Sequence, residues 1–249
     1  MSKTLIVMPL EKEFTALTEF LTSAGHGTEE LAGKTTASWF RDLTLVVAVA
    51  GHGKAQFAAT TQYLIDHYGP FGLVVAAGAA GGLAGHLRPG DVVMATETVE
   101  HDYKLRFRGD APAPRHPCTS EVRARIAHFY PQSSVFRLHV GPIASGDEDV
   151  VDAARAQELH KQTDALCVAW EGAGGAKAAQ LNGIPFLEIR AVTDAADGEA
   201  PESYRIHHLE AVKNIGRVLL PWLRDQMRQG DAQQSAALDD DSATLPPRQ

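Results

Sequence analysis

The chain has 249 residues, of which 44% are hydrophobic, and a formal net charge of −8, so it is long enough for one large α/β domain or two small ones with a sizeable core. The negative charge argues against non-specific binding to nucleic acid or an anionic membrane, and no apolar run approaches the roughly 20 residues of a membrane helix. Two cysteines are too few for a disulfide framework and the start has no signal-peptide layout, so we expect a cytoplasmic protein.

Short apolar runs alternate with helical patterns along most of the chain. In chain order, strands are predicted over 4–9, 43–49, 73–77, 91–97, 136–143, 166–169 and 185–194, and helices over 10–24, 54–67, 120–129, 150–161, 172–181 and 203–228. The three prolines of 111–117 predict an exposed loop. This alternation predicts a single-domain, three-layer α/β/α sandwich with a central mixed sheet over residues 1–229. Residues 230–249 are rich in Asp, Ala, Ser, Gln and Pro without periodicity, which predicts a disordered tail.

The strand that starts at Phe186 is nearly continuous in its apolar character, broken only by Glu188 and Arg190. Such a run is typical of a strand that is buried on both faces. It ends in Thr193-Asp194, and the carboxyl end of a buried strand is where open α/β sheets bind their ligands. We therefore predict that Asp194 is a catalytic acid.

Two further carboxylates, Glu13 and Glu171, also come just after predicted strands. For Glu13 an ordinary alternative is stabilisation of the helix dipole in a first helical turn. No metal-ligand cluster, Ser-His-Asp order or Cys-His arrangement accompanies these carboxylates, so we expect neither a metal nor a cofactor. Converging carboxylates suit the cleavage of an acetal-like bond, in which one acid protonates the leaving group and one base activates water. Because strand-end carboxylates have many uses, spacing alone leaves other chemistries open.

Several short motifs follow one another along the chain: Gly-Ala-Ala-Gly-Gly-Leu at 78–83, Gly90-Asp91, His101-Asp102, Ser145-Gly146-Asp147, Glu171 and Arg-Ala-Val-Thr-Asp at 190–194. In the order and spacing of these motifs, the chain resembles the purine nucleoside phosphorylase/nucleosidase superfamily over roughly residues 4–225. Within that superfamily it is most similar to the 5′-methylthioadenosine/S-adenosylhomocysteine nucleosidases. The resemblance implies a small-molecule nucleoside substrate and a homodimer.

The resemblance also implies a role for each matching residue. Asp194 would protonate N7 of the departing purine, which requires that burial raise the pKa of this carboxyl group. Glu171 would accept hydrogen bonds from the sugar hydroxyls and favour a cationic ribosyl transition state. Glu13 would activate the attacking water, and Arg190 would support the site electrostatically.

The resemblance places the remaining substrate-binding positions at His52, Ala79, Gly81, Asp149, Val150 and Trp170. Four of these depart from the nucleosidases, which usually carry Ser at the position of Ala79, an aromatic residue at Asp149, an apolar residue at His52 and Met at Trp170. Ala169 likewise stands where an acidic residue is usual. Such a polar pocket suggests substrates other than methylthioadenosine, among them adenosine, 5′-deoxyadenosine, 5′-polar nucleosides and futalosine-type nucleosides.

Hydrolysis and phosphorolysis differ in the segment before Glu13. Phosphorylases of the superfamily carry a Gly-Asp-Pro segment and an Arg that binds phosphate, whereas this chain has Met-Pro-Leu-Glu-Lys-Glu at 8–13. A carboxylate there repels phosphate, so we expect a hydrolase, with a phosphorylase or a futalosine-type hydrolase as alternatives. A nucleoside-binding protein without catalysis is a third alternative, because Ala79 and Asp149 depart from the pattern.

Overall fold

The computed structural model describes residues 2–107, 109, 111–130, 133 and 135–242. Its strands are β1 (Lys3–Met8), β2 (Glu29–Glu30), β3 (Ala37–Phe40), β4 (Leu45–Val49), β5 (Phe71–Gly82), β6 (Val92–Glu100), β7 (Arg115–Pro117), β8 (Leu138–Ser145), β9 (Cys167–Ala169) and β10 (Phe186–Asp194). Its α-helices are α1 (Glu11–Ser23), α2 (Lys54–Tyr68), α3 (Ser120–Phe129), α4 (Ala153–Thr163), α5 (Gly172–Leu181) and α6 (Ala200–Ser242), with a short 3₁₀ helix at Arg41–Leu43.

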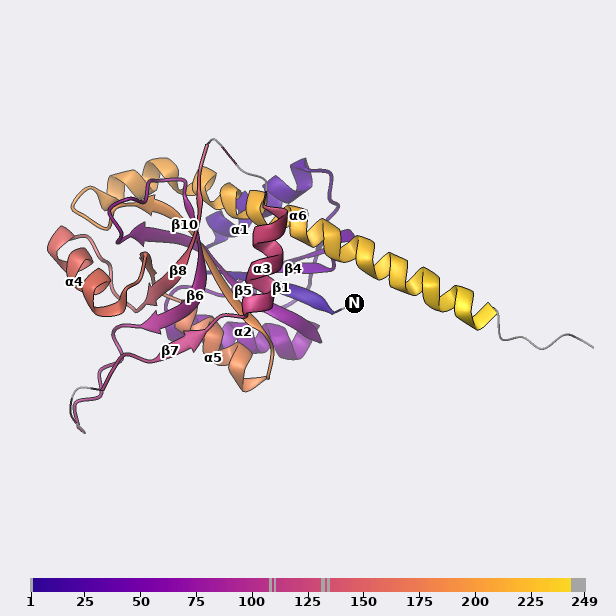
Figure 1. Ribbon diagram of the computed structural model, residues 1–249, viewed down its shortest axis with the longest axis horizontal. Helices are drawn as coiled ribbons and strands as arrows, with labels where there is room; N and C mark the ends of the chain where they lie inside the picture. Colours follow the sequence, from indigo (N-terminus) through magenta and orange to yellow (C-terminus); the bar gives the residue numbers. More distant parts are fainter. Residues whose placement is uncertain (1, 108, 110, 131–132, 134, 243–249) are drawn as a thin grey trace, which may run out of the picture.

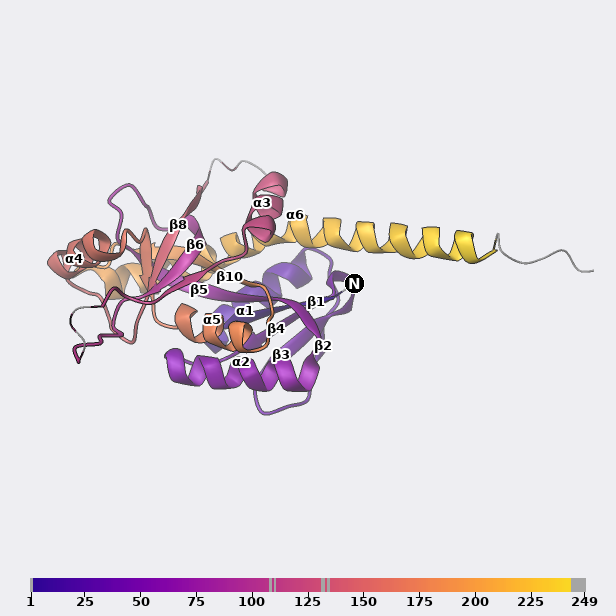
Figure 2. The ribbon, with the colours of Figure 1, turned by 60° about the horizontal axis from the view of Figure 1, so that its bottom comes forward.

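The predicted three-layer arrangement with a mixed central sheet is confirmed. Helices α1, α3 and α6 lie on one side of the sheet, and α2 and α5 lie on the other (Figure 2). Strand β1 runs parallel to both β4 and β5, and β5 runs parallel to β10. By contrast, β6 runs antiparallel to β10, and β9 runs antiparallel to β5. Because β6 pairs with β8, β8 with β9, β9 with β5 and β10 with both β5 and β6, five strands close into a ring.

Strand β5 is the centre of this arrangement, since it pairs with β1, β9 and β10. Its register sets Ala79 beside Ala191 and Gly81 beside both Asp194 and Val168. Every residue of β10 is buried, as its apolar run predicts, including its three charged residues, Glu188, Arg190 and Asp194. The register of β5 therefore brings the ends of β9 and β10 to the same place.

Several element boundaries differ from the sequence predictions. Strand β5 continues through the glycine-rich stretch to Gly82, because glycines can lie in an extended strand where neighbouring side chains need the space. Helix α4 starts at Ala153, since the Asp152 side chain accepts a hydrogen bond from the Arg155 backbone N–H (2.8 Å) and caps the helix there. Strands β2 and β3 had no prediction, and β7 pairs with β6 at the end of what was predicted as a loop.

Helix α6 does not end near Arg228 as predicted but continues to Ser242. The helix thus covers 230–242 of the predicted tail, while 243–249 lie outside the described residues, and the disorder of the tail stays a prediction. The stretch is free of proline up to Ser242 and contains three Ala, two Gln and one Leu, which favour helix even without an apolar stripe. Both ribbon views show this part of α6 leading away from the sandwich (Figures 1 and 2). Among the described helices, none has both the length and the apolar character needed to cross a membrane.

Candidate active site

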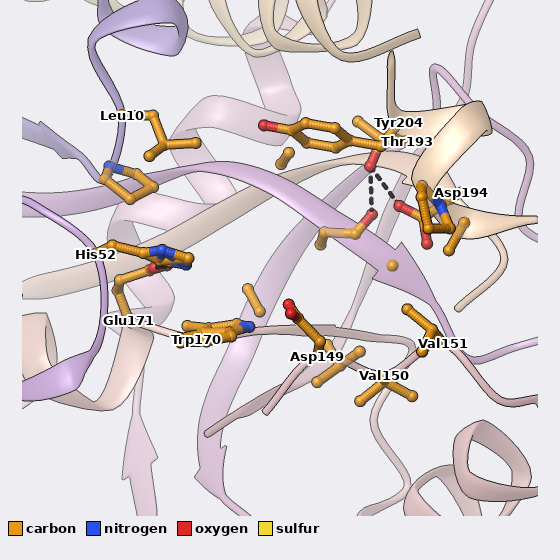
Figure 3. A pocket seen from close by; sticks show the side chains of 18 of the residues that line it. Leu10, His52, Asp149, Val150, Val151, Trp170, Glu171, Thr193, Asp194 and Tyr204 are labelled. Atoms are coloured by element: carbon orange, nitrogen blue, oxygen red, sulfur yellow. Dashed lines mark hydrogen bonds and ion pairs between the residues drawn. The ribbon is translucent and has the colours of Figure 1, made fainter. Parts of the chain in front are cut away.

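One cavity of about 420 Å³ collects nearly all the residues that the sequence singles out (Figure 3). Its walls come from the ends of β5 and β10, the start of α6, and the segments that follow β1, β4, β8 and β9. Nine of the ten predicted site residues line it: Glu13, His52, Ala79, Gly81, Asp149, Val150, Trp170, Glu171 and Asp194. Residues that are up to 181 positions apart, such as Glu13 and Asp194, thus face one space.

Asp194 lies at the last position of β10 and is 8% exposed. Its Oδ2 accepts a hydrogen bond from the Thr193 hydroxyl (2.7 Å), and its Oδ1 accepts one from the Ala196 backbone N–H (2.9 Å). Burial raises the pKa of this carboxyl group above its ordinary value. A Cβ atom at Gly81 would lie 2.9 Å from Oδ1, so glycine at this position leaves room for the acid. The group is suited to hold a proton at the edge of a cavity.

Glu13 lies in the first turn of α1 but does not face solvent there, being 1% exposed. Its Oε1 accepts a hydrogen bond from the Ala79 backbone N–H (3.0 Å), and its Oε2 has no hydrogen-bond partner among the described residues. Burial raises the pKa of Glu13 to about 7. A helix-dipole role alone does not explain this burial, whereas a carboxylate that titrates near neutral pH can serve as a base.

Arg190 is the predicted site residue that does not line the cavity. It is wholly buried behind the cavity wall, so the electrostatic support that the resemblance implies for it would be indirect, without contact to a substrate. Its Nε donates to Oε1 of Glu188 (2.8 Å), and its Nη1 lies 3.3 Å from Oε2 of Glu171. A Cβ atom at Gly78 would lie 2.9 Å from Nη1 of Arg190 and 3.0 Å from Oε2 of Glu13, so only glycine allows these two groups so near. The guanidinium therefore acts on the cavity through carboxylates.

An aromatic pair forms the floor of the cavity on the side of Glu171. The rings of His52 and Trp170 lie 4.2 Å apart at 39°, and Nε2 of His52 is 3.8 Å from Oε1 of Glu171. The side chain of Asp149 points into the cavity beside the Trp170 indole (Figure 3). The polar pocket expected from His52, Trp170 and Asp149 is thus consistent with where these side chains lie.

Two residues of this region had no functional prediction. Tyr204 lines the cavity from the second turn of α6, and no local pattern distinguishes it from other residues of that helix. The other residue is Glu188, which pairs with Arg190. This pair could have been predicted from the sequence, because opposite charges two positions apart in a buried strand lie on the same face.

Comparisons with known proteins find related chains. Residues 3–224 match the family described as the phosphorylase superfamily. A 5′-methylthioadenosine/S-adenosylhomocysteine nucleosidase of Actinobacillus succinogenes is 32% identical over 167 residues, which cover 65% of this chain and 72% of that protein. The crystal structure of such a nucleosidase from Helicobacter pylori with butyl-thio-DADMe-Immucillin-A has a TM-score of 0.81 at 26% identity, covering 90% of this chain and 99% of the other. A futalosine hydrolase of Helicobacter pylori has a TM-score of 0.79 at 25% identity, with coverage of 90% and 98%.

Proposed function

Because this chain belongs to the phosphorylase superfamily, we propose that it is an N-glycosyl hydrolase that releases the base from a purine nucleoside. The observation that carries the proposal is the convergence of Asp194, Glu13 and Glu171 on one cavity. The names of the relatives point to adenine nucleosides of the 5′-methylthioadenosine and S-adenosylhomocysteine type. Burial raises the pKa of both Asp194 and Glu13, as an acid and a base that work near neutral pH require.

In the proposed reaction, protonated Asp194 donates its proton to N7 of the purine. The bond between the base and C1′ of the sugar breaks, its electron pair leaves with the base, and positive charge develops on the sugar. Glu171 accepts hydrogen bonds from the sugar hydroxyls, and its negative charge stabilises that cation. Glu13 accepts a proton from the water that attacks C1′. Arg190 supports the reaction by holding Glu171 at 3.3 Å from behind the cavity wall.

The charges around the cavity favour water over phosphate as the nucleophile. Among the described residues that line it, Lys12 is the one permanent cation, while five carboxylates line it: Glu13, Glu148, Asp149, Glu171 and Asp194. The Arg190 guanidinium already faces Glu171 and Glu188. A phosphate dianion here would lie among carboxylates, which costs binding free energy.

A futalosine-type hydrolase is a second candidate within the same reaction class. It is favoured by the similarity to the Helicobacter pylori futalosine hydrolase and by the run Glu-Gly-Ala-Gly at 171–174, which resembles those enzymes. Both candidates use the same acid and base, so a substrate panel separates them.

The test is base release from methylthioadenosine, S-adenosylhomocysteine, adenosine and futalosine in phosphate-free buffer, followed by chromatography. We expect turnover without phosphate, and we expect Asp194→Asn to lower kcat by about 10²–10⁴-fold, because the amide has no proton to give. The matched control is Asp197→Asn, since Asp197 lies outside the cavity lining and its side chain bonds the Glu199 N–H (3.0 Å).

Three outcomes would contradict parts of the proposal. Strict dependence on phosphate, with a sugar 1-phosphate as product, would make the protein a phosphorylase. Tight nucleoside binding without turnover would make it a binding protein. Full activity of the Asp194→Asn variant would remove the assignment of the acid.

A further inference from the structure

The hydroxyl group of Tyr204 faces the cavity without a protein partner. Among the residues that the structure describes, none forms a hydrogen bond to this oxygen, although the residue is partly buried. Burial and the nearby charges of Glu13, Glu171 and Asp194 raise the pKa of Tyr204, so the hydroxyl keeps its proton and is available as a donor. A ligand in the cavity can therefore form a hydrogen bond with it.

The ring of Tyr204 is held in a defined orientation. The Lys12 ammonium lies 4.4 Å from the ring centroid, and the ring of His208 stacks on it at 4.8 Å and 14°. Such contacts limit rotation of the side chain before any ligand binds. The direction of the hydroxyl is therefore built into the site, and a hydrogen bond to it would cost little ordering entropy.

The proposed reaction orients a nucleoside along the cavity. Asp194 and Val151 lie at one end, and His52 and Leu10 lie at the other (Figure 3). With the base at Asp194 and the sugar over Glu171, the end near His52 and Leu10 receives the substituent on C5′. Figure 3 shows the Tyr204 hydroxyl on the side of its ring that faces Leu10, away from Asp194. The tyrosine thus offers its donor toward the 5′ side of the sugar.

His52 supplies a second polar group at this end. Its side chain is 48% exposed, its ring lies against Trp170, and neither of its nitrogens forms a hydrogen bond among the described residues. The nearest carboxylate oxygen, Oε1 of Glu171, is 3.8 Å from Nε2, which is too far for a hydrogen bond. The His52 imidazole and the Tyr204 phenol would therefore both lie beside the 5′ substituent, and each can still form a hydrogen bond with it.

We infer that Tyr204 and His52 select purine nucleosides whose 5′ substituent forms hydrogen bonds, a 5′-hydroxyl group above all, over nucleosides with a 5′-thioether. The inference rests on the proposed function, because it uses the position of the sugar that the reaction requires. A thioether sulfur is a weak acceptor, so it would leave both protein groups desolvated and poorly paired. Sites built to bond a substrate hydroxyl discriminate strongly against the analogue that lacks it.

The experiment is a two-by-two comparison of kcat/KM, with adenosine and 5′-deoxyadenosine as substrates and the wild type and Tyr204→Phe as enzymes. The two nucleosides differ only in the 5′ oxygen, and the two proteins differ only in the phenolic oxygen. We expect the wild type to prefer adenosine by roughly 10-fold to 100-fold. Tyr204→Phe should lower kcat/KM for adenosine by about 10-fold and leave that for 5′-deoxyadenosine within about twofold.

The matched control is Tyr68→Phe, which removes a phenolic oxygen that bonds the Ala32 carbonyl (2.8 Å) outside the cavity. This variant should leave the preference for adenosine unchanged. His52→Leu should shift the preference toward methylthioadenosine. An equal loss on both substrates in Tyr204→Phe, or a wild type that prefers methylthioadenosine to adenosine, would overturn the inference while leaving the hydrolase proposal intact.

The inference can be tested even if the wild type cleaves no nucleoside, a result that would refute the proposed function. Calorimetry would then measure the dissociation constants of adenosine and 5′-deoxyadenosine for the same two proteins. A 5′-hydroxyl preference in binding that Tyr204→Phe abolishes supports it. Equal dissociation constants for the two nucleosides in the wild type refute it.

Discussion

Replacing Glu188 by alanine should lower the free energy of unfolding by about 3–5 kcal/mol, because it removes the partner of a wholly buried charge. Glu188 and Arg190 are both 0% exposed, and Nε of Arg190 donates to Oε1 of Glu188 at 2.8 Å. The Thr98 hydroxyl donates to the other oxygen of the carboxylate. Nη1 and Nη2 of Arg190 form no hydrogen bond among the described residues. Without Glu188 the guanidinium would lose its hydrogen-bonded partner and keep the ion pair with Glu171, whose Oε2 lies 3.3 Å from Nη1.

The magnitude follows from the burial of both partners. In a chain of this size each kcal/mol shifts the melting temperature by about 2–4 °C, so Glu188→Ala should melt roughly 6–20 °C lower than the wild type. Glu188→Gln should cost less than Glu188→Ala, since the amide oxygen can still accept from Arg190. This order separates the missing acceptor from the missing charge.

The assay is urea unfolding followed by circular dichroism, with Glu29→Ala as the matched control. Glu29 pairs with Arg41 at 3.2 Å, but the two side chains are 61% and 73% exposed. Such a surface pair contributes about 0–1 kcal/mol. If Glu188→Ala lowers the free energy of unfolding no more than Glu29→Ala does, the reasoning from a buried ion pair is refuted.

Two further predictions concern groups next to this pair. Burial raises the pKa of Glu13 from 4.5 to about 7, so ionisation opposes folding and the wild type should lose about 3 kcal/mol of stability between pH 4.5 and pH 7. Glu13→Gln should lack this loss in urea unfolding at a series of pH values; a difference between the two proteins that does not change with pH would contradict the shift. Gly172→Ala should destabilise the fold by about 1–3 kcal/mol, since its Cβ would lie 2.1 Å from Oε2 of Glu188, whereas nothing lies within 4 Å of a Cβ at Gly85. A Gly85→Ala variant as destabilised as Gly172→Ala would show that the contact with Glu188 is not the cause.

Much of the fold follows from local patterns in the sequence. The apolar run at β10, the strand-helix alternation and the mixed three-layer sandwich were predictable, because periodicity and breaking residues act over a few neighbouring positions. The same patterns failed where tertiary contacts decide the boundary. The predicted strand stops at residue 77, yet β5 continues through Gly78 and Gly81, where Arg190, Glu13 and Asp194 occupy the space that larger side chains would fill.

The resemblance to the superfamily supplied the candidate site residues, and three of them, Glu13, Glu171 and Asp194, line one cavity. Their catalytic roles, the homodimer and the cytoplasmic location stay predictions. Other features depend only on the tertiary structure. Tyr204 enters the cavity because helix α6 begins just beyond β10, and no neighbour in the sequence signals that position.

Local sequence patterns identify the buried strands and the carboxylates that follow them, since burial imposes a pattern on adjacent residues. The positions of Arg190 behind the cavity wall and of Tyr204 in its lining are visible only in the folded protein. Such positions depend on how distant strands and helices pack, and above all on strand register. The pairing of β5 with β10, through Gly81 and Asp194, joins residues more than a hundred positions apart, and no local pattern encodes that register.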